Sequence, residues 1–194
     1  MNNKKFELTD ITMEFEGRTL YRIRALKNFK NVKVGDLGGW VSNENNLSQY
    51  GDCWIYNNAM CMDNSRMFGN SRMYNGSRMF DSGKMFGNSI MYGSSEMHGS
   101  SEMHDNSKMF DSGKMFGNSI MYNYSRMYDD SEMHDNSKMN GNSKMNGNSK
   151  MFDNSKMFDD SKMFGDSEMH NNSKMFGDSV LKAKEKLYGE VVSI

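Results

Sequence analysis

Residues 67–90 read MFGNSRMYNGSRMFDSGKMFGNSI, which is four consecutive six-residue units that each begin with Met. Met recurs at every sixth position from Met67 to Met175 without interruption, so nineteen of the 23 Met residues occupy one place in a repeat. The same frame adds five further first positions and gives 24 units in total: Gln49, Ile55, Cys61, Leu181 and Leu187. Such a strict internal period indicates a repeat architecture.

Each unit follows one pattern. The first residue is large and apolar, and the second is mostly aromatic, His or Asn. The third and fourth are mostly Gly, Asp or Asn, the fifth is nearly always Ser, and the sixth is mostly Lys, Arg or Glu. A period of six would rotate successive Met residues by about 600° on an α-helix, so they would spread around it rather than form a stripe. The pattern therefore favours a short strand followed by a tight turn, with Met on one side of the strand.

One unit buries one Met and one Ser, which is too little to fold alone, so units must stack on one another. A triangular coil of three units points every Met toward a shared core. The pattern resembles the hexapeptide-repeat proteins, in which an aliphatic residue is followed four places later by a small one, as Met67 is by Ser71. Met replaces the family's usual Ile, Val or Leu. The resemblance implies an all-β, single-stranded, left-handed parallel β-helix, here triangular, with 18 residues per coil and about eight coils.

If a coil has 18 residues, positions 18 apart stack in register. On one face the charges then alternate in sign at every step: Arg78, Glu96, Lys114, Glu132, Lys150, Glu168 and Lys186. The outward residues two places later alternate between Phe and His and end in Tyr: Phe80, His98, Phe116, His134, Phe152, His170 and Tyr188. Alternation avoids like-charge stacking and gives cross-strand pairs worth a few tenths of a kcal/mol each. This column supplies the candidate interaction face: Phe80, Glu96, His98, Phe116, Glu132, His134, Phe152, Glu168 and His170.

The N-terminal segment predicts a cap for the coils. Residues 5–27 alternate apolar and polar residues around Glu16-Gly17, which predicts a β-hairpin. A solenoid end exposes core and strand edges, and the hairpin with Trp40 is expected to cover one end. The expected domain organisation is a hairpin and capping segment over 1–48 and a hexapeptide-repeat β-helix over 49–192.

Three short motifs in this region carry a closer resemblance. They are GGW at 38–40, LSQ at 47–49 and GDCW at 51–54. Together with the hairpin and the repeats, they resemble a bacterial and phage family of hexapeptide-repeat proteins often labelled as transferases. At the other end of the chain, Glu185 falls at a small inward place, so a frayed last coil and a short helix over 180–188 are both open alternatives.

Composition limits the classes of ligand, the location and the cysteine chemistry expected of the protein. The chain has 194 residues and a net charge of −1, which gives no case from bulk charge for nucleic-acid or acidic-membrane binding. Neither a signal-peptide core nor a stretch of about 18 apolar residues is found, so the expected location is cytoplasmic, without membrane contact and with virion association left open. Cys53 and Cys61 are too few for a disulfide framework and have no neighbouring His for zinc, so two buried thiols are expected.

All four His lie in Glu-Met-His sequences: Glu96/His98, Glu102/His104, Glu132/His134 and Glu168/His170. In each, Glu and His are expected to project from the same side of one strand, within reach of each other. The resemblance implies a precedent for chemistry, because hexapeptide-repeat acyltransferases use a His base and related carbonic-anhydrase-like proteins bind metal with His across a subunit boundary. His98, His134 and His170 would stack two coils apart, at about 10 Å, which is too far for them to share a metal ion. No catalytic residue, metal site or cofactor is therefore assigned.

Rows of exposed aromatic residues on a flat face are typical of a contact surface. The partners considered are another copy of the chain, a glycan and single-stranded nucleic acid, and self-association is preferred. The first hypothesis is a non-enzymatic solenoid of phage or prophage type that acts as a scaffold, binding or self-association module. The alternative is a transferase-like enzyme that works as an oligomer with a His, such as His98 or His134, at a subunit boundary.

Overall fold

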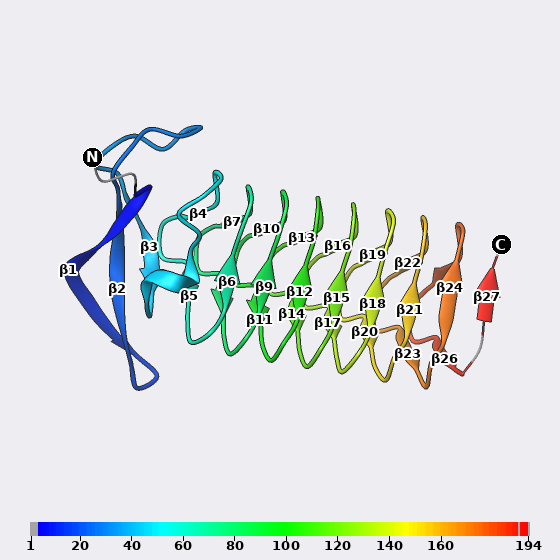
Figure 1. Cartoon of the computed structure of the whole chain (residues 1–194). Helices are drawn as coiled ribbons and strands as arrows, with labels where there is room; N and C mark the ends of the chain where they lie inside the picture. Colours follow the sequence, from blue (N-terminus) through cyan, green and yellow to red (C-terminus); the bar gives the residue numbers. More distant parts are fainter. Residues whose placement is uncertain (1–3, 190, 194) are drawn as a thin grey trace.

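The computed structural model describes residues 4–189 and 191–193 and forms a rod-shaped parallel β-solenoid with a β-hairpin at its N-terminal end (Figure 1). Most strands consist of the sixth residue of one unit and the Met of the next. Each Met pairs with the Met 18 residues away, as Met97 does with Met115 and Met103 with Met121. The predicted all-β solenoid, with 18 residues per coil and about eight coils, is therefore confirmed.

The strands form three sheets, one for each side of the triangular coil. The first sheet includes the hairpin: β1 (Phe6–Phe15), β2 (Arg18–Ala25), β3 (Leu37–Val41), β5 (Met60–Cys61), β8 (Arg78–Met79), β11 (Glu96–Met97), β14 (Lys114–Met115), β17 (Glu132–Met133), β20 (Lys150–Met151), β23 (Glu168–His170) and β26 (Lys186–Tyr188). The second sheet contains β4 (Trp54–Ile55), β7 (Arg72–Met73), β10 (Ile90–Met91), β13 (Lys108–Met109), β16 (Arg126–Met127), β19 (Lys144–Met145), β22 (Lys162–Met163) and β25 (Val180–Leu181). The third sheet contains β6 (Arg66–Met67), β9 (Lys84–Met85), β12 (Glu102–Met103), β15 (Ile120–Met121), β18 (Lys138–Met139), β21 (Lys156–Met157), β24 (Lys174–Phe176) and β27 (Val191–Ser193).

A three-residue 3-10 helix, η1 (Glu44–Asn46), precedes the first regular coil. Within residues 4–189 and 191–193, no helix has the length and apolar character needed to cross a membrane.

The core of the rod is a continuous column of Met side chains. All nineteen repeat Met residues are at most 1% exposed. The corners are set by the third residue of each unit, which has a positive φ throughout from Gly51 to Gly189. Asp81, for example, has a φ of 56°. Asp and Asn tolerate this left-handed conformation better than other side chains, and Ala183 is the one position in this series that is not Gly, Asn or Asp.

The predicted N-terminal hairpin forms, with β1 and β2 paired antiparallel around Glu16-Gly17. At the end of the core, Phe6 and Phe29 pack edge-on against the buried ring of Trp54, with centroids 6.4 and 5.3 Å away. These aromatic contacts close the N-terminal end of the solenoid.

The repeat frame starts differently from the prediction. Leu47, rather than Gln49, pairs with Met67 and is buried, while the side-chain carbonyl of Gln49 accepts hydrogen bonds from the backbone N–H groups of Lys5 and Phe6. The first coil is therefore two residues longer than the regular 18-residue coil. The side chain of Gln49 is hydrogen-bonded to the first strand and so does not take the inward place.

The predicted alternative of a short helix over 180–188 is wrong. β25 and β26 continue the stack there, and Glu185 is exposed instead of pointing inward. In the last coil Val192 pairs with Met175, which is one residue earlier than the frame predicts.

The buried Ser hydroxyls fall into two groups. Ser137 Oγ donates to the carbonyl of His134 at 2.7 Å, and several other repeat Ser make the same contact three residues back. Among the described residues, Ser131 Oγ and nine other repeat Ser hydroxyls are buried without a hydrogen-bond partner. An unpaired buried hydroxyl is a net cost to folding, whereas a paired one contributes modestly.

This division predicts opposite effects for one substitution at neighbouring positions. Ser137→Ala is expected to lower the free energy of unfolding by about 1 kcal/mol. Ser131→Ala is expected to leave it unchanged or raise it, because no hydrogen bond is lost. Urea unfolding of the two variants measures the difference, and an equal loss at both positions would contradict the assignment of the hydroxyls.

Candidate functional site

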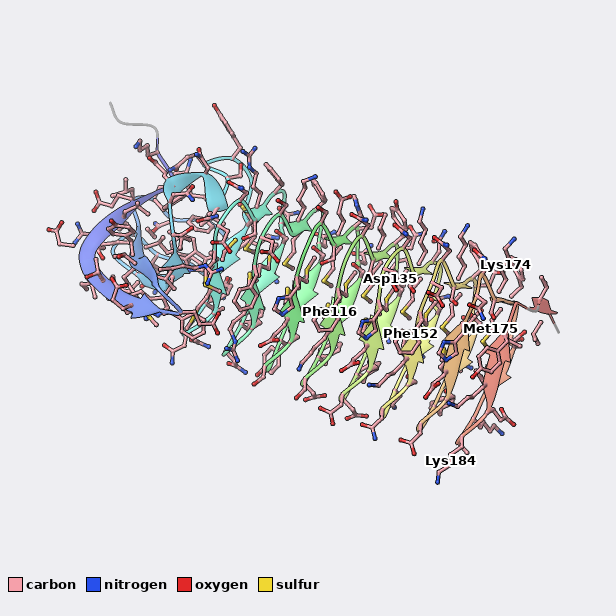
Figure 2. The ribbon with its side chains drawn as sticks, turned by 90° about the horizontal axis from the view of Figure 1, so that it is seen from below. Phe116, Asp135, Phe152, Lys174, Met175 and Lys184 are labelled. Atoms are coloured by element: carbon pink, nitrogen blue, oxygen red, sulfur yellow. The ribbon has the colours of Figure 1, made fainter. Side chains whose placement is uncertain are left out.

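The candidate interaction face lies on the outer surface of the first sheet. Seven rings, from seven successive coils, stack with centroids 4.5–5.1 Å apart and interplanar angles of 7–15°: Phe80, His98, Phe116, His134, Phe152, His170 and Tyr188. Figure 2 places Phe116 and Phe152 on the same flank of the rod. Because each inner ring is covered on both sides by its neighbours, the surface offers ring edges rather than ring faces.

A column of charges runs beside the rings. The distances from Glu Oε2 to His Nε2 are 3.2 Å for Glu96/His98, 3.0 Å for Glu132/His134 and 2.8 Å for Glu168/His170. Each Glu also pairs with a cation of a neighbouring coil: Arg78–Glu96 at 3.2 Å, Lys150–Glu132 at 2.9 Å and Lys186–Glu168 at 2.8 Å. The predicted contact between Glu and His within a strand is thus confirmed. We call the outer surface formed by the two columns, residues 78–188 of the first sheet, the ladder face.

The ion pairs keep the side chains of Glu132 and Glu168 charged. Burial acts to raise the pKa of Glu132, but hydrogen bonds from Lys150 and His134 outweigh it and hold the pKa below its ordinary value of 4.5. Hydrogen bonds from Lys186 and then His170 lower the pKa of Glu168 in the same way. A carboxyl group with a lowered pKa is ionised at neutral pH, so these residues are suited to accepting ion pairs and not to general-acid catalysis.

The hairpin covers the N-terminal end of the ladder face. Phe80 is 6% exposed and packs with Leu20 of β2 and with Met62. The Arg18 guanidinium lies 5.9 Å from the Phe80 ring, and that of Arg78 lies 5.6 Å from a hairpin ring. Phe80 therefore makes an internal contact, and the open part of the ladder face begins with the next coil.

The other two sheets carry shorter ring stacks. On the third sheet, rings stack from Phe68 through His104 to Tyr122, and Asn140 then takes the next ring position. Asn146 takes the equivalent place on the second sheet. Both Asn side chains accept a hydrogen bond from the following Gly N–H at 2.7 Å. The stack on the first sheet is thus longer than those on the other two, and it runs without a break.

The His residues are not assembled into a shared catalytic or metal centre. His98 and His134 lie on opposite sides of the Phe116 ring, with centroids 5.1 and 4.8 Å from it. Over residues 4–189 and 191–193, no group of three or more His, Cys, Asp or Glu is close enough to hold a metal ion. An open hollow of about 570 Å³ lies beside the hairpin, where its lining includes Glu7 and Arg24 but no His.

Three further ionisable side chains are buried near the cap. Cys53 and Cys61 are free and buried, as predicted, and burial raises the pKa of Cys61 to about 12, so its thiol is not reactive. Lys5 is fully buried, and its Nζ donates to the Cys53 carbonyl at 2.9 Å and lies 3.2 Å from Cys53 Sγ. Burial lowers the pKa of Lys5. The sequence gives no sign of this contact, because a Lys among polar residues is normally solvated.

Comparison with known proteins gives one local similarity. No family model matches the chain. A stretch of 38 residues, 20% of the chain, is 45% identical to the uncharacterized acetyltransferase YdcK of Escherichia coli (strain K12). The match covers 12% of that protein, so the chain spans a small part of its relative. The similarity is consistent with the transferase label given to proteins that this sequence resembles.

Proposed function

We propose that this protein is a non-enzymatic solenoid scaffold of phage or prophage type that associates with further copies of itself through the ladder face. The observation that carries the proposal is the unbroken stack of rings beside a column of alternating charges. The phage or prophage setting is supported by the resemblance of the N-terminal motifs. Self-association is supported by the charge column, because a surface on which both signs alternate is complementary to itself.

The ring geometry makes single-stranded nucleic acid a poorer partner. Bases bind to aromatic side chains by stacking on their faces, and in this column the inner rings already cover one another. A protein surface can pack against ring edges and form ion pairs with the neighbouring Glu and Lys residues. The ladder face therefore suits a flat protein partner, and a second copy supplies one.

The test compares two Phe→Asn substitutions. Asn already occupies this place in the repeat at Asn140 and Asn146, so the fold tolerates it. Phe116→Asn interrupts the ladder face and is expected to weaken self-association at least tenfold in sedimentation equilibrium. Phe110→Asn, on the second sheet, is the matched control and is expected to leave association unchanged. A wild-type chain that stays monomeric at millimolar concentration would overturn the proposal.

A transferase-like enzyme is the second candidate, and the local match to YdcK favours it. In that case His98 or His134 would act as a base at a boundary between two copies. The test is release of free thiol from acetyl-coenzyme A by the wild-type chain and by His134→Gln in the presence of amine and hydroxyl acceptors. Turnover by the wild type that is lost in His134→Gln would favour the enzyme over the scaffold.

A further inference from the structure

The pattern of charges on the ladder face restricts how two copies can meet, if they meet there as proposed above. We call each charged residue with its ring a rung, for example Glu132 with His134. Successive rungs are about 4.8 Å apart, the spacing of neighbouring strands. Their charges alternate from Arg78 to Lys186 without a repeat of sign. A shift of one rung between two copies therefore changes every facing pair from opposite to like charge.

We infer that two copies pair face to face and antiparallel about a two-fold axis that lies in the plane of the interface, perpendicular to the rod, and passes between the Glu132 and Lys150 rungs. A two-fold axis through a rung would place that residue opposite its own copy and every other charge opposite one of the same sign. An axis midway between rungs places every Glu opposite a Lys. The alternation thus selects axes between rungs over axes through them.

The hairpin then selects among the axes between rungs. It covers the Phe80 rung, where Arg18 and Leu20 pack over the ring. An axis one rung closer to the hairpin, between the Lys114 and Glu132 rungs, would press this rung against the partner's Glu168 rung. With the axis between Glu132 and Lys150, the hairpin of each copy lies past the partner's Tyr188. The facing pairs are then Glu132–Lys150, Lys114–Glu168 and Glu96–Lys186, each formed twice.

Groups on the ladder face are free to form these pairs. The salt bridges of Glu132 and Glu168 all use Oε2, which leaves Oε1 of each without a partner among the described residues. Over that same part of the chain, Lys114 makes no salt bridge. Lys114 and Glu168 Oε1 face each other in the inferred dimer, so their contact adds an ion pair without breaking one within a chain.

The inferred interface is small. Six open rungs cover about 29 Å of the rod, so the contact is at the low end of the range for specific interfaces. Its exposed ion pairs are screened by salt. We expect a weak dimer whose dissociation constant rises at least tenfold between low and high salt.

Cross-linking of variants that carry one added surface Cys tests the register. Lys114→Cys and Glu168→Cys are prepared separately and treated with a short bismaleimide, alone and as a mixture. The buried Cys53 and Cys61 are expected not to react. The mixture is expected to give at least ten times more cross-linked dimer than either variant alone, because residue 114 faces residue 168 and not its own copy. Lys108→Cys mixed with Lys162→Cys, on the second sheet, is the matched control and should not cross-link.

Sedimentation of the wild type and of each variant separates the two possible failures. If the wild type does not associate, the proposed function fails. If it associates but either variant cross-links alone, or the mixture does not cross-link, the inferred register is wrong while self-association stands. Glu132→Cys mixed with Lys150→Cys provides a second facing pair, in case one substitution weakens the dimer.

Discussion

Excision of residues 123–140 is expected to leave a folded rod that is one coil, or about 4.8 Å, shorter. After the excision Met145 takes the place of Met127 above Met109, so the core column stays continuous. Phe152 likewise comes to lie on Phe116, and the ring stack is preserved. Small-angle scattering measures the change in length, and far-UV circular dichroism with thermal unfolding measures the retained fold.

Excision of only three residues, 123–125, is expected to have the opposite result. The inward places beyond the cut would then receive polar residues in every unit up to residue 160: Asp130, Asn136, Asn142, Asn148, Asn154 and Asp160. Each buried and unpaired polar group costs about 1–3 kcal/mol, so the six together cost about as much as the usual 5–15 kcal/mol stability of a whole domain. The chain beyond residue 122 should therefore lose its cooperative fold. Equal stability of the two excision variants would contradict the assignment of the frame.

Replacement of one core Met should show how closely the column is packed. Met133 lies in β17 beneath the ladder face and is fully buried. Met133→Ala is expected to lower the free energy of unfolding by about 2–5 kcal/mol, because it removes buried apolar atoms and leaves a cavity. Met133→Leu, which conserves volume, is expected to cost less than about 1.5 kcal/mol.

The effect of Met133→Ala should also be local. A solenoid is stabilised coil by coil through contacts with its nearest neighbours, so the weakened coil opens first. Hydrogen exchange followed by mass spectrometry is expected to show faster exchange in the coil around residue 133 and in its two neighbours. Tyr124→Ala provides the control, because this ring is 54% exposed and its loss should change stability by less than about 0.5 kcal/mol. A uniform increase in exchange along the rod would contradict the local picture.

Much of the fold and of the candidate site follows from the sequence. The strict recurrence of Met identifies the inward residue of each unit, and Met67 to Met175 are indeed all buried. The sign alternation at an 18-residue spacing identifies the first sheet, and the predicted Glu–His contacts form. These features are predictable because each coil repeats the environment of the last, so one local solution serves the whole repeat.

Residues outside the repeat pattern are harder to predict. Leu47 takes the buried place assigned to Gln49, since Gln49 is needed to bind the backbone of the first strand. The hairpin folds onto Phe80 and removes it from the open surface. Lys5 is buried against Cys53, although nothing near it in the sequence suggests burial. Each of these contacts joins segments that have no periodic relation to each other.

The amino-acid sequence is enough to specify the coil: its length, its inward Met residues, its corner residues in the left-handed region and the order of charges along each face. Period and residue type suffice for these, because they depend on neighbours at fixed offsets of 6 and 18 residues. Three features become visible only in the folded protein: which ring faces are covered, which Ser hydroxyls find a partner and how far the hairpin extends over the first sheet. These depend on how side chains and the cap pack in three dimensions, and packing between segments without a common period leaves no signature in the sequence.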